Sequence, residues 1–193
     1  MPNKNTQKSN IKQAATKLFA ENGYLETNLW NIASASKISK GGIYHHYLKK
    51  EDILFDILND FLDQLLGNIE LELKNIEGNQ AKLEYIISRH ILISADHMNK
   101  AKVLVRHSYC LPSKKFQIIA KKEKKYYQIV YDVISEFLGK GISKEKLTAI
   151  TFSLWGICNW TYIWYDPRKG LTPENVAEIF KNVFIDGAKK AVT

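Results

Sequence analysis

Glycine, basic and hydroxyl-bearing residues gather in the stretch SKGGIYHHYLKK, residues 39–50, and their types suit contact with a polyanion such as DNA. A helix that begins after Ser39 would direct free backbone N–H groups at phosphate oxygens. Each glycine costs such a helix roughly 1 kcal/mol relative to alanine, so two in a row need a reason. Close approach of the backbone to DNA is one reason, because a side chain would hold the backbone away. A plain loop containing Gly41 and Gly42 is the alternative.

The side chains of this stretch divide between two faces. Ile43 and Tyr47 are four residues apart and are predicted to face the core. Tyr44 and His45 then point away from them, where a hydroxyl and ring N–H groups can meet phosphates or base edges. His46 offers a further N–H donor.

Positive charge is concentrated at the same end of the chain. The first 50 residues hold eight lysines against two glutamates, a net charge of +6, while the whole chain carries +8. Lys40 and Lys50 bracket the glycine-containing stretch. A basic end on a near-neutral body indicates a polyanion partner. A solubilising surface is the alternative.

Catalysis and metal binding find little support in the sequence. It shows no nucleophile motif, paired carboxylates or phosphate loop, so we expect no enzyme and no cofactor. His90 and His97 are two helical turns apart, too far to share one metal ion unaided, and no metal site is expected. Two cysteines, Cys110 and Cys158, without a CxxC pattern argue against a disulfide framework. With a polar N-terminus, this composition favours the cytoplasm.

The spacing of apolar residues predicts an all-α chain that positions these groups. The N-terminal part is expected to contain a helix ending at Gly23, a short helix capped by Thr27, a tight turn at 36–38 and a short helix capped by Ser39. Two short helices joined by such a turn form a helix-turn-helix, whose second helix enters the major groove.

The remaining helices are longer. They are predicted from Lys50 to about Asn75, at about 80–98, 101–110 and 113–138, from a cap at Ser143 to Tyr165, and from Thr172-Pro173 onward. Residues 147–165 carry no charge, but their threonine, serine and asparagine residues favour a helix buried in protein over a membrane span.

Residues 11–55 resemble the DNA-binding domain of TetR-family transcriptional regulators. The resemblance rests on AATKLFAENGY, on Thr27, on Ile32-Ala33, on SKGGIYHHY and on KEDIL. It implies an all-α homodimer with a three-helix DNA-binding domain at 1–49 and an effector-binding and dimerisation domain at 50–193.

From the residues and the resemblance together, ten positions are predicted to contact DNA: Thr27, Lys37, Ser39, Lys40, Gly41, Gly42, Tyr44, His45, His46 and Lys50. Four positions depart from the family pattern. Lys37 stands where glycine is common in the turn, and Gly42 stands where threonine or serine is common. Lys49 replaces a common polar cap before the next helix, and Trp30 lies on a face that should be solvated.

The C-terminal half is predicted to hold the effector and the partner subunit. An apolar stripe on the last helix and another on the helix from 144 could pair with their two-fold mates, although an intramolecular core is the alternative. The predicted dimer residues are Leu154, Ile157, Ile179, Phe180, Val183 and Phe184.

Aromatic and polar residues between these parts indicate a small-molecule cavity, and Tyr126 is among the aromatic ones. The predicted ligand-binding residues are Tyr85, Arg89, His90, Arg106, His107, Tyr109, Tyr127, Tyr131, Trp155 and Tyr162.

Residues 159–180, NWTYIWYDPRKGLTPENVAEIF, resemble the C-terminal segment of TetR regulators of fatty-acid and related catabolism, several of which respond to acyl-CoA thioesters. The resemblance implies a long apolar cavity for an acyl chain, with Arg89, Lys102 or Arg106 serving the CoA phosphates. The expected function is a repressor that binds a palindromic operator and is released by a hydrophobic effector. A multidrug or aromatic-compound sensor, or a helical protein that binds nucleic acid non-specifically, are the alternatives.

Overall fold

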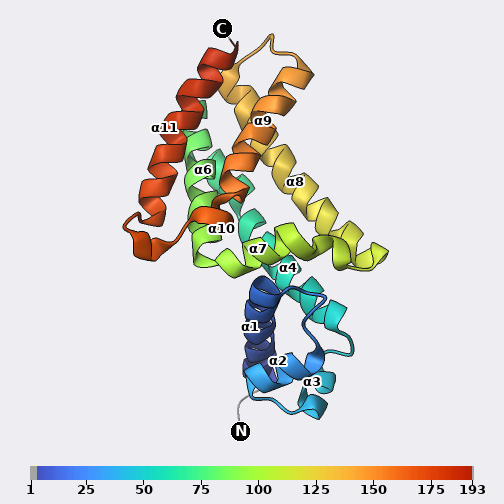
Figure 1. Cartoon of the computed structure of the whole chain (residues 1–193). Coiled ribbons are helices and arrows are strands. Elements are labelled where there is room, and N and C mark those ends of the chain that lie inside the picture. Colours follow the sequence, from blue (N-terminus) through green and yellow to red (C-terminus); the bar gives the residue numbers. More distant parts are fainter. Residues whose placement is uncertain (1–3, 193) are drawn as a thin grey trace. The chain divides into compact units, whose positions relative to one another are not determined.

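The computed structural model describes residues 4–192, and these residues form helices and connecting turns without a strand (Figure 1). The all-α prediction is therefore confirmed. The helices are α1 (Lys4–Asn22), α2 (Leu29–Ser36), α3 (Lys40–His46), α4 (Lys50–Leu66), α5 (Ile69–Lys74), α6 (Asn79–Asp96), α7 (Met98–His107), α8 (Ser113–Leu138), α9 (Lys144–Asn159), α10 (Thr161–Trp164) and α11 (Pro173–Val192), with 3-10 turns η1 (Ser108–Cys110) and η2 (Pro167–Lys169).

The first compact unit contains the described residues up to Asp63 together with Met98–Lys121. In this unit α1 packs against α2 and α7, and α2 packs against α3. Its core includes Ile11, Phe19, Ile32, Ile43 and Ile53, all fully buried. The start of α4 thus belongs to the same core as the helix-turn-helix, which differs from the predicted division at residue 50.

The second unit contains Gln64–His97 and the described residues from Lys122 onward. Here α6 packs against α9, α10 and α11, and α11 also contacts α9 (Figure 1). Its core includes Leu83, Ile87, Tyr126, Ile134 and Leu154. Helices α4 and α8 each contribute residues to both units.

The predicted helix from Lys50 to Asn75 is wrong, because it breaks after Leu66. Gly67 has a φ of +32°, a conformation that L side chains rarely adopt. A Cβ on Gly67 would lie 2.6 Å from Nη2 of Arg89. That guanidinium donates two hydrogen bonds of 3.2 Å to the carbonyl of Gln64, so it satisfies the C-terminal end of α4.

The predicted helix from Ser143 to Tyr165 is also wrong, since α9 ends at Asn159 and the short α10 begins at Thr161. The Thr161 hydroxyl donates to the carbonyl of Cys158 over 2.8 Å and takes up one of the terminal carbonyls of α9. Helix α7 ends at His107, short of the predicted residue 110, where η1 continues. In the described residues we find no helix that is both long enough and apolar enough to cross a membrane.

The predicted caps are confirmed at Ser39 and Ser143, whose side chains accept from backbone N–H groups of Gly42 and Lys146. Thr172 likewise accepts from the N–H of Asn175 at the start of α11. The cap predicted at Thr27 is one residue early. Asn28 caps α2 instead, and its side chain and that of Asn31 bond each other's backbone N–H groups.

Candidate DNA interface and effector site

The turn between α2 and α3 is closed by backbone hydrogen bonds around a left-handed residue. Lys37 has φ 55° and ψ 34°, and it is the non-glycine residue with a positive φ in the described chain. The N–H of Ile38 bonds the carbonyl of Ala33 over 3.1 Å, which ends α2 tightly. The common glycine of the family at position 37 is explained by this conformation, because glycine adopts it without steric cost.

Helix α3 presents one face to solvent and one to the core, as the sequence predicts. Ile43 is fully buried and Tyr47 is buried at 4% exposure, whereas Tyr44 is 42% exposed. His45, Lys40 and Gly41 are also exposed, and the Lys40 ammonium lies 5.9 Å from the centre of the Tyr44 ring. The exposed face of α3 therefore carries a cation, a phenol and an imidazole beside bare backbone.

The two glycines of α3 have different causes. A Cβ on Gly42 would lie 2.7 Å from Cγ2 of Ile38 and 3.3 Å from Oγ of Ser39, so the turn itself requires glycine there. A Cβ on Gly41 would meet nothing within 4 Å, and its φ is not positive. Nothing in the described fold requires glycine at position 41, and the close approach of its backbone to DNA stays a prediction.

Three residues predicted to contact DNA are engaged inside the first unit. The Lys50 ammonium donates to the carbonyls of Tyr24 (2.6 Å) and Thr27 (2.7 Å) and lies 4.1 Å from the centre of the Tyr24 ring. Burial lowers the pKa of Lys50. The Lys50 side chain thus links the start of α4 to the α1–α2 connection, and its contact with DNA stays a prediction.

Thr27 and His46 likewise form hydrogen bonds with other residues of the first unit. The Thr27 side chain is buried at 2% exposure, and its hydroxyl donates to the carbonyl of Gly23 over 2.8 Å. His46 is half-buried, and its Nε2 lies 3.2 Å from Oε1 of Gln7 on α1. Lys37 and Ser39 are exposed beside α3, and Trp30 on α2 is 66% exposed on the face noted as unusual.

A small cavity in the second unit lies among α6, α8 and α9. It is lined by Ile86, Ile87, His90, Val130, Leu154, Trp155 and Cys158 and encloses about 10 Å³, room for about one water molecule. This cavity is much smaller than the long cavity expected for an acyl chain, because the lining side chains pack closely around it.

The polar end of this cavity is uncharged. His90 is buried, and its Nδ1 lies 3.1 Å from the Tyr126 hydroxyl. Burial lowers the pKa of His90 to about 4, although a hydrogen bond with the Asn159 side chain opposes this shift. Burial also raises the pKa of Tyr126 and raises that of the Cys158 thiol to about 12. At neutral pH these groups offer hydrogen bonds and no net charge.

Aromatic rings continue from this polar group to the surface. Trp155 lies 6.3 Å from His90 and 5.6 Å from Tyr126, centre to centre, and 5.9 Å from Tyr127. Tyr127 in turn lies 5.2 Å from Phe152, which is 57% exposed, and 6.1 Å from Tyr131. The structure thus brings four predicted ligand-binding residues together: His90, Tyr127, Tyr131 and Trp155. Tyr126, which spacing alone did not separate from the other aromatic residues, lies among them.

The other predicted ligand-binding residues have different surroundings. Arg89 caps α4 and pairs with Glu72 over 3.3 Å, and the Tyr85 hydroxyl donates to the same carboxylate. Arg89 is therefore committed to the fold. Tyr162 stacks near Trp160, with ring centres 6.2 Å apart. Arg106, His107 and Tyr109, together with Lys102, belong to the first unit.

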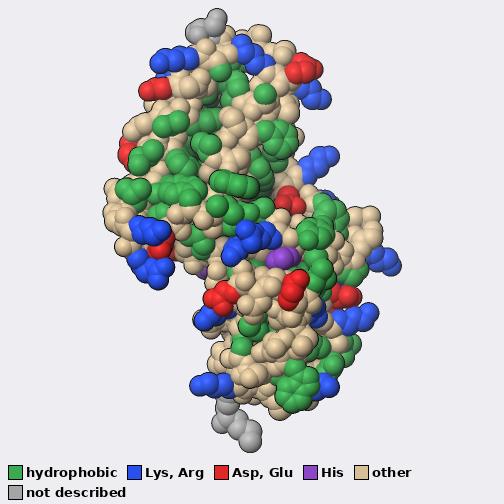
Figure 2. Space-filling model, in the orientation of Figure 1, with side chains coloured by type: hydrophobic (Ala, Val, Ile, Leu, Met, Phe, Trp, Pro, Cys, Tyr) green, Lys and Arg blue, Asp and Glu red, His purple; other side chains and the backbone are tan. Residues whose placement is uncertain are grey.

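Apolar side chains remain exposed on α9, α10 and α11. The most exposed are Phe152, Trp160, Ile163, Trp164, Ile179 and Val183. Figure 2 shows hydrophobic side chains gathered on the face in view of the part that contains these helices. Of the predicted dimer residues, Ile157 and Phe180 are half-exposed, while Leu154 and Phe184 are buried in the protomer and belong to its own core.

The fold and the exposed face of α3 define a helix-turn-helix DNA-binding protein with a separate helical domain. The model of "Bacterial regulatory proteins, tetR family" matches residues 11–57, and that of the "Tetracyclin repressor-like, C-terminal domain" matches residues 77–188, more than half of the chain. The chain belongs to the TetR family of transcriptional regulators, as the resemblance in its first 55 residues implied.

Relatives and solved structures agree with this membership. The transcriptional repressor KstR2 of Rhodococcus jostii is 24% identical over 187 residues, 95% of this chain and 92% of the relative. The fatty acid metabolism regulator protein of Bacillus subtilis is 29% identical over 150 residues, 76% of each chain. A TetR-family regulator from Bordetella parapertussis has a TM-score of 0.88 at 26% identity, covering 93% and 94% of the two chains. AibR, solved with isovaleryl coenzyme A and operator DNA, has a TM-score of 0.78 at 25% identity, covering 92% and 97%.

Proposed function

We propose that this regulator binds a palindromic operator as a homodimer and is released by an acyl thioester. The observation that carries the DNA part is the exposed face of α3, where Lys40, Gly41, Tyr44 and His45 are open to solvent while Ile43 is buried on the opposite side. A cation, two hydrogen-bonding rings and accessible backbone are the groups that phosphates and base edges accept. We infer that the protein acts by binding rather than by catalysis and that it works in the cytoplasm.

The homodimer is supported by the exposed apolar side chains of α9 and α11. Gly156 and Gly187 lie on these helices, and a Cβ on either would meet nothing within 4 Å in the protomer. Glycine inside a helix costs about 1 kcal/mol relative to alanine, which close approach of a partner helix would offset. Two copies would present two α3 helices to half-sites one or more DNA turns apart, roughly 34–36 Å per turn.

Two observations support an acyl thioester as the effector: the uncharged polar side chain of His90 at the cavity, and the ligand and regulatory role named for similar proteins. The seven lining residues carry no formal charge, since His90 is uncharged at neutral pH. A thioester carbonyl can accept a hydrogen bond there without bringing in a charge, whereas a free carboxylate would be buried without a cation. AibR was solved with isovaleryl coenzyme A, and the Bacillus subtilis relative is a fatty acid metabolism regulator protein. A planar aromatic or drug-like ligand is the second candidate, favoured by the rings of Tyr127 and Trp155.

Release requires that the ligand enlarge a cavity whose present volume is about 10 Å³. Helix α4 supplies residues to both units and is the proposed link to the DNA-binding part, in place of the longer helix expected from the sequence. Tenfold relief of DNA binding needs only about 1.4 kcal/mol of ligand preference for the non-binding state.

Selection from a random-sequence duplex library tests the DNA part. We expect an inverted repeat to be enriched by the wild-type protein, and Tyr44→Ala and His45→Ala to weaken binding to it. Lys144→Ala, an exposed residue at the start of α9, is the control and should bind as the wild type does. Enrichment of unrelated sequences would overturn specific recognition and leave a non-specific binder.

Titration of acyl-CoAs of several chain lengths against the operator complex tests the effector. The free acids, coenzyme A and a planar aromatic cation are the comparison ligands. Binding of one acyl-CoA with release of DNA supports the proposal. Binding of the aromatic cation alone would move the effector to the drug-like class, and binding without release would remove the coupling through α4.

A further inference from the structure

The recognition helix α3 has few apolar anchors. It is seven residues long, and Ile43 is the buried residue within it. An isolated helix of this length is not stable in water, so its direction depends on contacts with the rest of the first unit. Its exposed side carries the DNA-facing groups and contributes no packing. The C-terminal end of α3 is therefore the place to look for what fixes its orientation.

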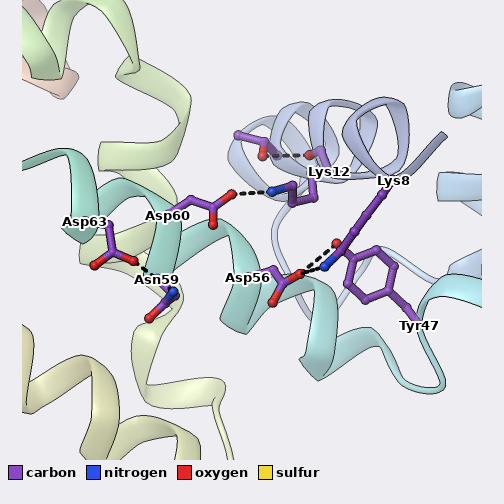
Figure 3. A network of polar contacts seen from close by, with 8 residues as sticks. Lys8, Lys12, Tyr47, Asp56, Asn59, Asp60 and Asp63 are labelled. Carbon is purple, nitrogen blue, oxygen red and sulfur yellow. Dashed lines mark hydrogen bonds and ion pairs between the residues drawn. The ribbon is translucent and has the colours of Figure 1, made fainter. Parts of the chain in front are cut away.

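Three elements meet at that end through one carboxylate (Figure 3). Tyr47, the C-cap of α3, donates its hydroxyl to Oδ2 of Asp56 on α4 over 2.9 Å. The Lys8 ammonium of α1 pairs with the same oxygen over 2.7 Å and lies 5.3 Å from the centre of the Tyr47 ring. We call these three residues, Lys8, Tyr47 and Asp56, the clasp.

The clasp is partly shielded from water. Tyr47 is 4% exposed, and the side chains of Lys8 and Asp56 are 45% and 27% exposed. Burial and the neighbouring Asp56 raise the pKa of Tyr47, so the phenol keeps its proton and remains a donor. A hydrogen bond to a charged acceptor is stronger than one between neutral groups. The phenylalanine analogue would keep the ring packing and lose this bond alone.

We propose that the clasp is a positioning device for DNA recognition, in which Asp56 holds the C-terminal end of α3 at the angle that lets Tyr44 and His45 reach the major groove. This inference rests on the proposed function, since it assumes that α3 reads an operator. It assigns a role to Asp56 and Lys8, which lie outside α3, and to the Tyr47 hydroxyl rather than to its ring. These are positioning residues and need not touch the DNA.

A purely structural role is the competing explanation, and the chain offers a matched control. One turn further along the same two helices, Lys12 of α1 pairs with Asp60 of α4 (Figure 3). This pair has similar exposure, at 27% and 39%, and joins the same helices, but its recorded bonds reach no residue of α3. Loss of either pair removes one contact between α1 and α4. Loss of the clasp also removes a bond to the C-cap of α3, whose other contacts, such as the His46–Gln7 pair and the buried Ile43, remain.

The experiment compares Tyr47→Phe, Asp56→Ala and Asp60→Ala in the full-length dimer. Fluorescence anisotropy gives the affinity for the selected operator and for a scrambled duplex of the same length, and thermal unfolding gives stability. We expect Tyr47→Phe and Asp56→Ala to lower operator affinity about tenfold while affinity for scrambled DNA stays within about twofold. Asp60→Ala should leave the ratio of operator to scrambled affinity unchanged, even if it lowers the melting temperature.

The double variant Tyr47→Phe/Asp56→Ala should bind the operator no worse than Asp56→Ala alone, because Asp56→Ala already removes the Tyr47–Asp56 bond that Tyr47→Phe removes. If Tyr47→Phe binds the operator as wild type does, or if Asp60→Ala lowers the affinity ratio equally, the positioning role is overturned. A wild-type protein that enriches no operator would instead overturn the proposed function. If Asp56→Ala fails to fold, the operator affinity of Tyr47→Phe compared with that of the wild type still tests the positioning role.

Discussion

The clasp of the first unit and the His90 group of the second are both side-chain networks, but they use opposite electrostatics. The clasp joins an ammonium and a carboxylate that are partly open to water. The His90 group joins a buried imidazole and a buried phenol to a half-buried amide, and none of the three is charged at neutral pH. A charged network suits a domain that must hold a rigid surface against a polyanion. A neutral network suits a cavity that must admit an apolar ligand without stranding a buried charge.

The largest expected effect lies at Gly41. Gly41→Leu should lower operator affinity by about a hundredfold or more, because the side chain would stand between the backbone and DNA. The fold should survive, since a Cβ at this position meets nothing within 4 Å. Circular dichroism and anisotropy on the same sample measure both properties.

Gly42→Leu is the matched control for that variant. Its Cβ would lie 2.7 Å from Cγ2 of Ile38, so we expect lost stability as well as lost binding. Wild-type affinity of Gly41→Leu would return Gly41 to a plain structural position and weaken the case for DNA contact by α3.

The second effect tests the neutral network through pH. The pKa of His90 is lowered to about 4 in the folded protein, whereas unfolded histidine titrates near 6.5. The unfolded state therefore binds a proton first as pH falls, and the folded protein loses stability from about pH 6.5 down to about pH 4. The loss from this group should reach about 2–3 kcal/mol by pH 4.5.

Urea unfolding at pH 7 and pH 4.5 measures that loss, and His90→Gln should reduce it. His45→Gln, at an exposed histidine of α3, should leave the wild-type loss unchanged. Equal pH dependence in wild type and His90→Gln would show that His90 does not carry the effect, and the contrast between the two networks would fail.

The third effect concerns Lys50, which the sequence placed among DNA contacts and the structure places under two backbone carbonyls. Lys50→Met keeps the aliphatic stem and removes both bonds, so it should cost about 2 kcal/mol of stability. The salt dependence of operator binding should stay as in the wild type, because no phosphate contact is lost. Lys49→Met, at a neighbour 70% exposed, should change stability by less than about 0.5 kcal/mol. A salt slope lowered by about 1 in Lys50→Met would restore the phosphate contact.

Features set by residues close in sequence could be predicted, whereas contacts between residues far apart in sequence could not. Caps at Ser39 and Ser143 and the buried positions of Ile43 and Tyr47 follow from residues within one helical turn. Lys50 with Tyr24 and Thr27, and Asp56 with Tyr47 and Lys8, join residues that only the tertiary fold brings together.

The effector domain shows the same limit. The helix break at Gly67 could not be predicted from nearby residues, because the side chain that requires glycine there is Arg89, which lies 22 positions later in the chain. The aromatic composition indicated a cavity, yet its size and its polar end depend on how Tyr126 and Trp155 pack against His90. Spacing along one helix carries no such information.

The smallest expected effect is at Lys37, and its sign is the informative part. A non-glycine residue with φ near +55° costs roughly 1–2 kcal/mol, while glycine adds entropy to the unfolded chain worth about 0.4–1 kcal/mol. Lys37→Gly should therefore stabilise the protein by about 0.5 kcal/mol. Lys40→Gly, in the first turn of α3 with ordinary helical φ, should destabilise it by about the same amount.

Each variant removes one positive charge beside α3, so both should bind DNA more weakly, while their stabilities should change in opposite directions. Thermal unfolding resolves that difference, and a fall in stability for both would mean that the charge at position 37, rather than its backbone, governs the turn.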